Sequence, residues 1–542
     1  MEGADGPAAR KFWDVRRLAA HWPDLLIVSA LLALFWCEHR FFEEVEFGGD
    51  AVQKWQFVRQ WSYANDFSHG EWTHHMARLG VNVTSWVVQK LFGRGWRAYY
   101  VGPFVMAALQ VPFIYLLAKR LGGRLGAVMA VLAITYLAMV HRSASQLLPD
   151  GYVGTWAIGA SYLYVRFAEA AERNKLPLLL ALGVASFVGY LVKETFVFFY
   201  PGFALAIWLV RRSWRDVAIF AAILFAGLVL ETAAYAAFTD YTWGRLAIIG
   251  GGHLAVDEDA VKDMAVGDLF IRFDELYNSS KYLLFFGFAA ALWHAVWRKD
   301  EQPKAAGMVL IGISHVFFLT FLVRKLHPLD TFQGPDPRYM DPMTPFIAVY
   351  SGAFLAMTLG ELWRRHASPN RWVQRYVPAA SATLQTLSAL SVIAVFGLVT
   401  YKYQRTHAPL DAFARGREIA DLVNRTYERN LPIFERSNRA KILTAIYDVY
   451  MDDTKLSRNG RLPDFEEVDF DHRGASYLIK NRHVYRKDTL SRLIDEHCYV
   501  LVKRGPARNK GTRDRRSTMG FETEEGGPPP QCDALLAELT AR

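Results

Sequence analysis

The chain of 542 residues is 52% hydrophobic and 14% aromatic, a composition that excludes an ordinary soluble domain. The net charge of +9 does not favour nucleic-acid binding, because the basic residues lie in short patches between apolar runs, as in the cytoplasmic loops of membrane proteins. The three cysteines exclude a disulfide scaffold and form no paired metal-binding motif.

About eleven apolar runs, each near the ~20 residues that cross a bilayer, predict a polytopic α-helical membrane protein. They cover residues 20–37, 98–118, 123–141, 152–168, 177–192, 195–210, 216–238, 281–297, 306–323, 342–360 and 380–401. Lys193-Glu194 interrupts one long apolar stretch between the fifth and sixth runs. A re-entrant pair of helices is the alternative interpretation of those two runs.

The positions of the basic residues predict the orientation. If Arg10 to Arg17 is cytoplasmic, every second connection between runs is short and basic, as the positive-inside rule requires. An odd number of spans then places the C-terminal part outside. We therefore expect an integral protein of a bacterial inner membrane, with an uncleaved first span, a cytoplasmic N-terminus, and a periplasmic active site and C-terminal domain.

The composition divides the chain into three parts. Residues 1–404 form the transmembrane domain, which includes a first outer loop at 38–97. Residues 405–505 are expected to form a small extracytoplasmic α/β domain, and residues 506–542 a disordered tail. The α/β assignment depends on an amphipathic helix and three short β-branched runs, at residues 408–435, 441–447, 475–480 and 499–503.

The first outer loop contains a carboxylate directly after two glycines, in the sequence Gly48-Gly49-Asp50. Glycines permit a tight backbone turn, which can hold the carboxylate over the mouth of a cavity. A carboxylate in that position can take the proton of an attacking hydroxyl. Asp50 is therefore the candidate catalytic residue, and a solvated carboxylate at the membrane interface is the alternative.

The same loop ends with His74, His75 and Arg78, which are candidates for binding the donor or the acceptor. His74 and Arg78 have the spacing of one helix face. A metal site is disfavoured, because adjacent histidines on a helix point apart. A basic cluster that contacts lipid headgroups is the other alternative.

Four charged residues farther along are further candidates for substrate binding. Asp150, between Pro149 and Gly151, is either a turn residue or a second acid that lines the cavity. Lys193 and Glu194 lie inside an apolar stretch, where charges are costly and tend to be functional. Lys193 is expected to bind a phosphate, and a structural Lys–Glu ion pair is the alternative. Glu231 is expected to face the interior of the bundle.

Arg338 and Tyr339 precede the tenth run in a proline-rich segment. An arginine at this depth can hold a lipid phosphate by paired hydrogen bonds, or its side chain can extend to a headgroup at the interface. We expect Lys193, Arg338 and Tyr339 together to bind the phosphate of a donor.

The order of three motifs resembles the family C glycosyltransferases, specifically the protein O-mannosyltransferase and lipid A aminoarabinose transferase group. These motifs are Gly49-Asp50, Lys193-Glu194 and Arg338-Tyr339, and the resemblance covers roughly residues 20–360. It implies a polyprenyl-phosphate-sugar donor used on the outer face, with Asp50 as the catalytic carboxylate and Arg338 on the donor phosphate. The chain departs from its relatives at His74-His75-Met76, where they often have a Pro-Pro pair, and it lacks the acidic dipeptide of the mannosyltransferases.

These observations together predict an inverting glycosyltransferase with Asp50 as base. It would move one sugar from undecaprenyl or dolichyl phosphate to a hydroxyl of a glycolipid, polysaccharide or protein. No cofactor is expected, and a divalent metal ion is compatible with the chemistry but not required. The expected partners are the lipid-linked donor, the acceptor and the bilayer, with no nucleic acid. The alternatives are a flippase for lipid-linked sugars and a polysaccharide polymerase or ligase with a diphosphate-linked donor.

Overall fold

The computed structural model describes residues 15–39, 74–93, 96–239, 243–249, 302–326, 329–331 and 337–353, together with five short strands between 433 and 524 and single residues in the gaps. Within these residues, five helices are long and apolar enough to cross a membrane. The chain is therefore an integral membrane protein, as its apolar runs predict.

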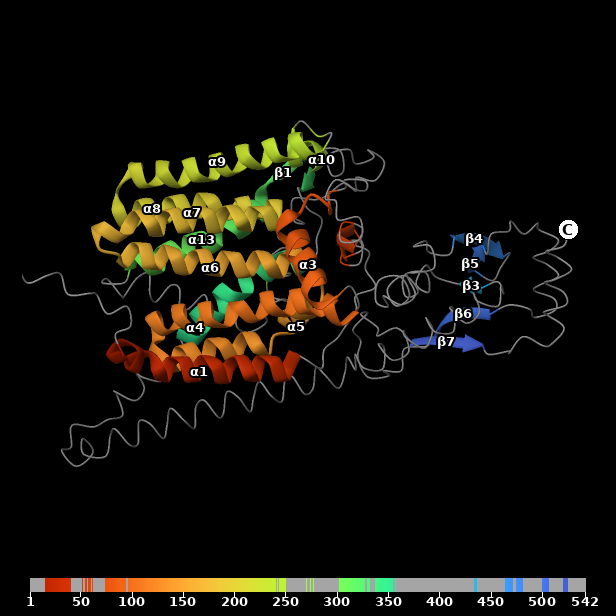
Figure 1. Cartoon of the computed structure of the whole chain (residues 1–542), viewed down its shortest axis with the longest axis horizontal. Coiled ribbons are helices and arrows are strands. Elements are labelled where there is room, and N and C mark those ends of the chain that lie inside the picture. Colours follow the sequence, from red (N-terminus) through yellow and green to blue (C-terminus); the bar gives the residue numbers. More distant parts are fainter. Residues whose placement is uncertain are drawn as a thin grey trace, which may run out of the picture.

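The helices form a bundle in which most lie roughly side by side (Figure 1). They are α1 (Val15–His39), α3 (Leu79–Phe92), α4 (Trp96–Thr135), α5 (Ala138–Ser145), α6 (Pro149–Glu169), α7 (Lys175–Val192), α8 (Tyr200–Arg211), α9 (Trp214–Phe238), α10 (Gly244–Ile249) and α13 (Gln302–Phe321). Three short 3-10 helices join them, namely η1 (Glu172–Asn174), η2 (Glu194–Phe199) and η6 (Pro337–Met343). The runs expected at 281–297 and 380–401 lie outside the described residues, so the number of spans stays a prediction.

Helix α4 crosses the bundle twice. Its 40 residues would extend about 60 Å as one straight helix, twice the thickness of a hydrocarbon core. Gly123, with φ +68°, breaks the helix in a conformation that favours glycine. After this break the chain returns to the end of the bundle where α4 begins. The Leu147 amide shows this return, since it donates to the hydroxyl of Tyr99 in the first turn of α4 at 3.1 Å. The separate runs expected at 98–118 and 123–141 are therefore two antiparallel passes.

One end of the bundle is basic and held by ion pairs between helices. Glu169, the last residue of α6, accepts from Lys304 of α13 at 3.2 Å and also pairs with Arg120 of α4. Glu172 accepts from Arg211, the last residue of α8, at 3.3 Å. These partners place the ends of α6 and α8 beside the start of α13. Among the described helices, the basic connections lie together at this end of the bundle. Which side of the membrane this end faces stays a prediction.

Helix α1 is attached to α4 at this basic end. Asp24 accepts hydrogen bonds from the Tyr115 hydroxyl at 2.8 Å, from Lys119 at 2.6 Å and from Arg124 at 2.9 Å. Charge-assisted bonds of this kind are shorter and stronger than neutral ones. Because Lys119 and Arg124 lie on opposite sides of Gly123, Asp24 fixes the turn between the two passes of α4.

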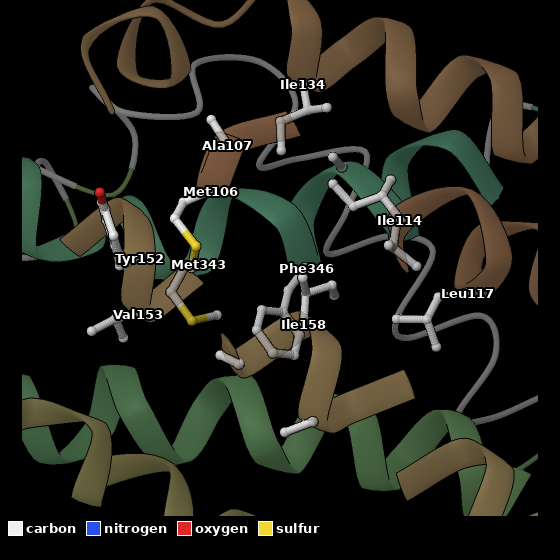
Figure 2. Packing of buried hydrophobic residues seen from close by; sticks show 14 of the residues in the cluster. Met106, Ala107, Ile114, Leu117, Ile134, Tyr152, Val153, Ile158, Met343 and Phe346 are labelled. Carbon is white, nitrogen blue, oxygen red and sulfur yellow. The ribbon is translucent and has the colours of Figure 1, made fainter. Parts of the chain in front are cut away.

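The segment that begins with η6 enters the middle of the bundle. Met343 and Phe346 are buried and lie among Met106, Val153 and Ile158 (Figure 2). Glycines allow this close packing, since a Cβ on Gly154 of α6 would lie 3.3 Å from the Pro342 Cα. This burial holds Arg338, Tyr339 and Asp341 at a fixed depth, at the end of the bundle opposite the basic one.

The C-terminal strands form a five-stranded sheet of order β4-β5-β3-β6-β7. They are β3 (Ile433–Glu435), β4 (Asp464–Phe470), β5 (Gly474–Lys480), β6 (Val500–Gly505) and β7 (Gly520–Glu524). β3 pairs parallel with β6 and antiparallel with β5. A separate antiparallel hairpin joins β1 (Val323–Leu326) and β2 (Leu329–Thr331).

Of these five strands, β5 and β6 coincide with expected runs, whereas β3, β4 and β7 lie where no strand was expected. β5 and β6 match the runs at 475–480 and 499–503, whereas the run at 441–447 lies outside the described residues. β3 occupies the end of the stretch expected to be helical at 408–435. β7 lies in the tail expected to be disordered, where it pairs antiparallel with β6 and extends the sheet past residue 505.

Candidate active site

A buried ion pair forms the centre of the site. Helix α7 ends where Lys193 becomes extended, with φ −157° and ψ 140°. Pro149 opens α6 and places Asp150 in its first turn, where the helix dipole stabilises a carboxylate. Lys193 Nζ donates to Asp150 Oδ1 at 2.6 Å, and the two residues are 2% and 3% exposed. Asp150 therefore lies in a helix and contacts Lys193, which excludes the interpretation as a turn residue.

The three residues expected to bind a donor phosphate lie together, although they come from distant parts of the chain. Lys193 Nζ is 4.3 Å from the centroid of the Tyr339 ring, within the range of a cation–π contact. Arg338 donates to the Tyr339 hydroxyl at 3.2 Å. Burial lowers the pKa of Lys193, and the Asp150 carboxylate opposes that shift. The site thus holds two cations around one aromatic ring.

A second cluster centres on Glu194, the residue after Lys193. Its carboxylate accepts from Arg78 Nη2 at 2.9 Å and from Arg245 Nη2 at 3.1 Å. Arg245 also donates to the Tyr190 carbonyl at 2.6 Å. Within the described residues, Lys193 therefore pairs with Asp150 of α6, whereas Glu194 pairs with Arg78, just before α3, and with Arg245 of α10. This arrangement differs from the Lys–Glu pair that was the structural alternative.

The other candidate residues lie in different places: one is buried, two are adjacent histidines before α3, and one is outside the described part of the chain. Glu231 is 7% exposed and its Oε1 lies 3.8 Å from Arg245 Nη1, so it faces the interior as expected. The ring centroids of His74 and His75 are 3.8 Å apart, and His75 Nδ1 lies 3.4 Å from Arg78 Nη1. Asp50 lies outside the described residues, so its position relative to both clusters stays a prediction.

Sequence reasoning missed Arg245, Ser143 and Asp341. Arg245 is 2% exposed. In the sequence it follows Gly244 in a polar connection, and the apolar residues after it were only a weak signal of burial. Asp341 is 5% exposed and accepts a hydrogen bond from Ser143. Burial raises the pKa of Asp341 to about 7. Its position between Met340 and Pro342 gave no sign of a partner in α5.

Gly80 sets the distance between α3 and the end of α7. A Cβ at this position would lie 2.7 Å from the Val192 amide nitrogen and 2.9 Å from its Cα. We expect Gly80→Ala to destabilise the protein by about 1–3 kcal/mol, because overpacking forces the backbone to shift. Thermal unfolding in detergent measures this effect, with Val83→Ala at a 43% exposed position of α3 as control. Equal melting temperatures for Gly80→Ala and wild type would contradict the close approach.

Comparison with known proteins adds a family match over part of the chain. Residues 79–235 match the family model for dolichyl-phosphate-mannose-protein mannosyltransferase. This segment extends from the first residue of α3 into α9 and contains Asp150, Lys193 and Glu194. No curated protein matches the chain.

The fold is similar to that of ArnT from Cupriavidus metallidurans. Its crystal structure in the apo state has 14% sequence identity and a TM-score of 0.54, over 86% of this chain and 100% of that one. The structure of the same protein bound to undecaprenyl phosphate gives the same identity and TM-score, over 90% and 93%. The family match over residues 79–235 and the shared fold agree with the resemblance that the sequence suggested.

Proposed function

We propose that the chain transfers one sugar from a polyprenyl-phosphate donor to an acceptor hydroxyl, with inversion at the anomeric carbon. The observation that carries the proposal is the meeting of Lys193, Arg338 and Tyr339 at one end of the bundle, through the 4.3 Å and 3.2 Å contacts of the tyrosine. The ArnT-like fold supports the same donor class, because an ArnT structure holds undecaprenyl phosphate. The acceptor is a hydroxyl of a glycolipid, a polysaccharide or a protein.

The cations serve the leaving group. As the bond between the anomeric carbon and the phosphate oxygen breaks, the phosphate keeps the electron pair and gains negative charge. Preorganised cations in a site that excludes water stabilise such charge strongly. Lys193 is already paired with Asp150 at 2.6 Å, so the donor phosphate takes the place of that carboxylate beside the ammonium. Arg338 provides a planar fork that matches two phosphate oxygens.

The second cluster holds these cations in position. Arg78 of the segment before α3 and Arg245 of α10 both bind Glu194, and Glu194 is covalently next to Lys193. These two contacts, together with the bond from Lys193 to Asp150 of α6, fix the end of α7 before the donor arrives, which reduces the cost of ordering the site on binding. Asp50 accepts the proton of the acceptor hydroxyl as that oxygen attacks the anomeric carbon.

A donor panel tests the proposal. Purified protein in lipid nanodiscs is given undecaprenyl-phosphate and undecaprenyl-diphosphate sugars with a membrane extract as acceptor, and mass spectrometry follows both products. We expect a new glycoside and free undecaprenyl phosphate from monophosphate donors only. Transfer only from diphosphate donors would instead support a polymerase or ligase. Movement of the lipid-linked sugar across the bilayer, without a new glycosidic bond, would support a flippase.

A further inference from the structure

Asp341 is a buried carboxylate next to the Lys193–Asp150 pair that the mechanism above does not use. Ser143 of α5 donates a hydrogen bond to Asp341 Oδ2. A Cβ on Gly151 would lie 2.7 Å from the Ser143 Cβ and 3.6 Å from Asp341 Oδ2. Because Gly151 follows Asp150 directly, the two carboxylates occupy neighbouring positions against the first turn of α6.

The two carboxylates differ in their direct partners, because Asp150 contacts a cation whereas Asp341 accepts from the Ser143 hydroxyl. Lys193 is the cation bound to Asp150, and burial leaves little water to screen a second negative charge. Two carboxylates in one buried site favour a state in which one of them keeps a proton. Burial and the nearby Asp150 charge both raise the pKa of Asp341, which lies at about 7.

The groups that face Asp341 come from every neighbouring element. Ser143 and Arg142 lie on α5, Asp150 on α6, Lys193 at the end of α7, and Thr344 directly after η6. His315 of α13 stacks on Phe199 at 4.2 Å and lies within electrostatic range of Lys193 and Asp150. The Ser143 hydrogen bond and the Arg142 charge favour the ionised form of Asp341, whereas Asp150 opposes it.

We propose that Asp341 is a positioning residue that couples binding of the donor phosphate at Lys193 to the uptake of a proton by its own carboxylate. This inference rests on the proposed function. When the phosphate pairs with Lys193, Asp150 loses its counter-ion and remains buried beside Asp341. A proton on Asp341 offsets the negative charge that the phosphate adds to this buried group. Binding therefore takes up a proton whenever Asp341 is ionised in the free protein.

The sign of the pH dependence follows from this coupling. Below pH 7 Asp341 already carries the proton, so affinity for a phosphate does not depend on it. Above pH 7 the proton must come from solvent, and affinity falls by up to about tenfold per pH unit. In Asp341→Asn the neutral amide removes this dependence. In Ser143→Ala the loss of a hydrogen bond to the ionised form moves the decline to higher pH.

The test uses farnesyl methyl phosphate, a phosphodiester whose single charge does not titrate near neutral pH, with the full-length protein in nanodiscs. Isothermal titration calorimetry from pH 5.5 to 8.5 compares wild type, Asp341→Asn and Ser143→Ala. A decline in wild-type affinity above pH 7 that Asp341→Asn abolishes supports the proposal. Identical pH profiles for wild type and Asp341→Asn overturn it and leave the donor class intact. No binding to wild type at any pH rejects the donor site itself.

A ligand-independent measurement keeps the proposal testable if either variant folds poorly. The infrared C=O band of a protonated buried carboxyl in the wild-type protein should disappear as the pH rises through about 7. Addition of farnesyl methyl phosphate at pH 8 should restore it. A wild-type spectrum in which the ligand leaves this band unchanged overturns the coupling.

Discussion

Replacing Asp50 by Asn is expected to lower the rate of sugar transfer about 10²–10⁴-fold, the usual contribution of a positioned general base. Asparagine has nearly the same size and still forms hydrogen bonds, but it cannot accept the proton of the acceptor hydroxyl. Donor binding should remain, since the phosphate is held by Lys193 and Arg338. Initial rates at saturating donor, together with calorimetric binding of the donor, measure the two effects separately.

Asp66→Asn provides the matched control for this experiment, because it makes the same chemical change in the same outer loop, 38–97. It should retain most of the wild-type rate. Thermal unfolding of both variants should match wild type, as expected for a residue whose role is chemical. A near-normal rate in Asp50→Asn, or an equal loss in both variants, would reject Asp50 as the base.

The helices were largely predictable from the sequence, because apolar length and charge alternation determine them directly. The runs at 152–168, 177–192 and 216–238 coincide with α6, α7 and α9. The break at Lys193 was visible as a charged dipeptide inside an apolar stretch. The alternative of a re-entrant pair is not supported, because α7 and α8 both extend from the basic end to the site end, as the Arg211–Glu172 and Lys193–Asp150 pairs show.

The partners of the charged residues were not predictable in the same way. Periodicity places Asp150 and Lys193 on different helices, but it contains no information on which helices are neighbours in the bundle. The pairing depends on tertiary contacts such as Gly80 against Val192 and Gly151 against Ser143. Arg245 was missed for the same reason, since only its contacts with Glu194 and Tyr190 show that it is buried. The strand β7 depends on pairing with β6, which its own polar sequence does not suggest.

Replacing Lys193 by Met is expected to have two large effects that must be separated. It removes a cation from the donor phosphate, and it leaves Asp150 as a buried carboxylate without the partner at 2.6 Å. Breaking one side of a buried ion pair typically costs about 3–5 kcal/mol. A loss of activity in Lys193→Met alone would therefore not distinguish a phosphate ligand from a structural cation.

The double variant Lys193→Met with Asp150→Asn separates the two effects. Removing both charges takes away the unpaired carboxylate, and exchange of a buried ion pair for neutral groups is often close to neutral in stability. We expect the melting temperature to recover most of what Lys193→Met loses, while affinity for farnesyl methyl phosphate stays at least about tenfold below wild type, since one charge-assisted contact is worth roughly 1.5–3 kcal/mol. If the double variant regains both stability and wild-type affinity, then Lys193 is a structural cation, and Arg338 alone has to account for the phosphate. If stability is restored but affinity for the phosphate stays low, Lys193 is a phosphate ligand. The Lys193–Asp150 ion pair then keeps the ammonium charged and in position in the free protein, where Asp150 occupies the place that the phosphate takes when the donor binds.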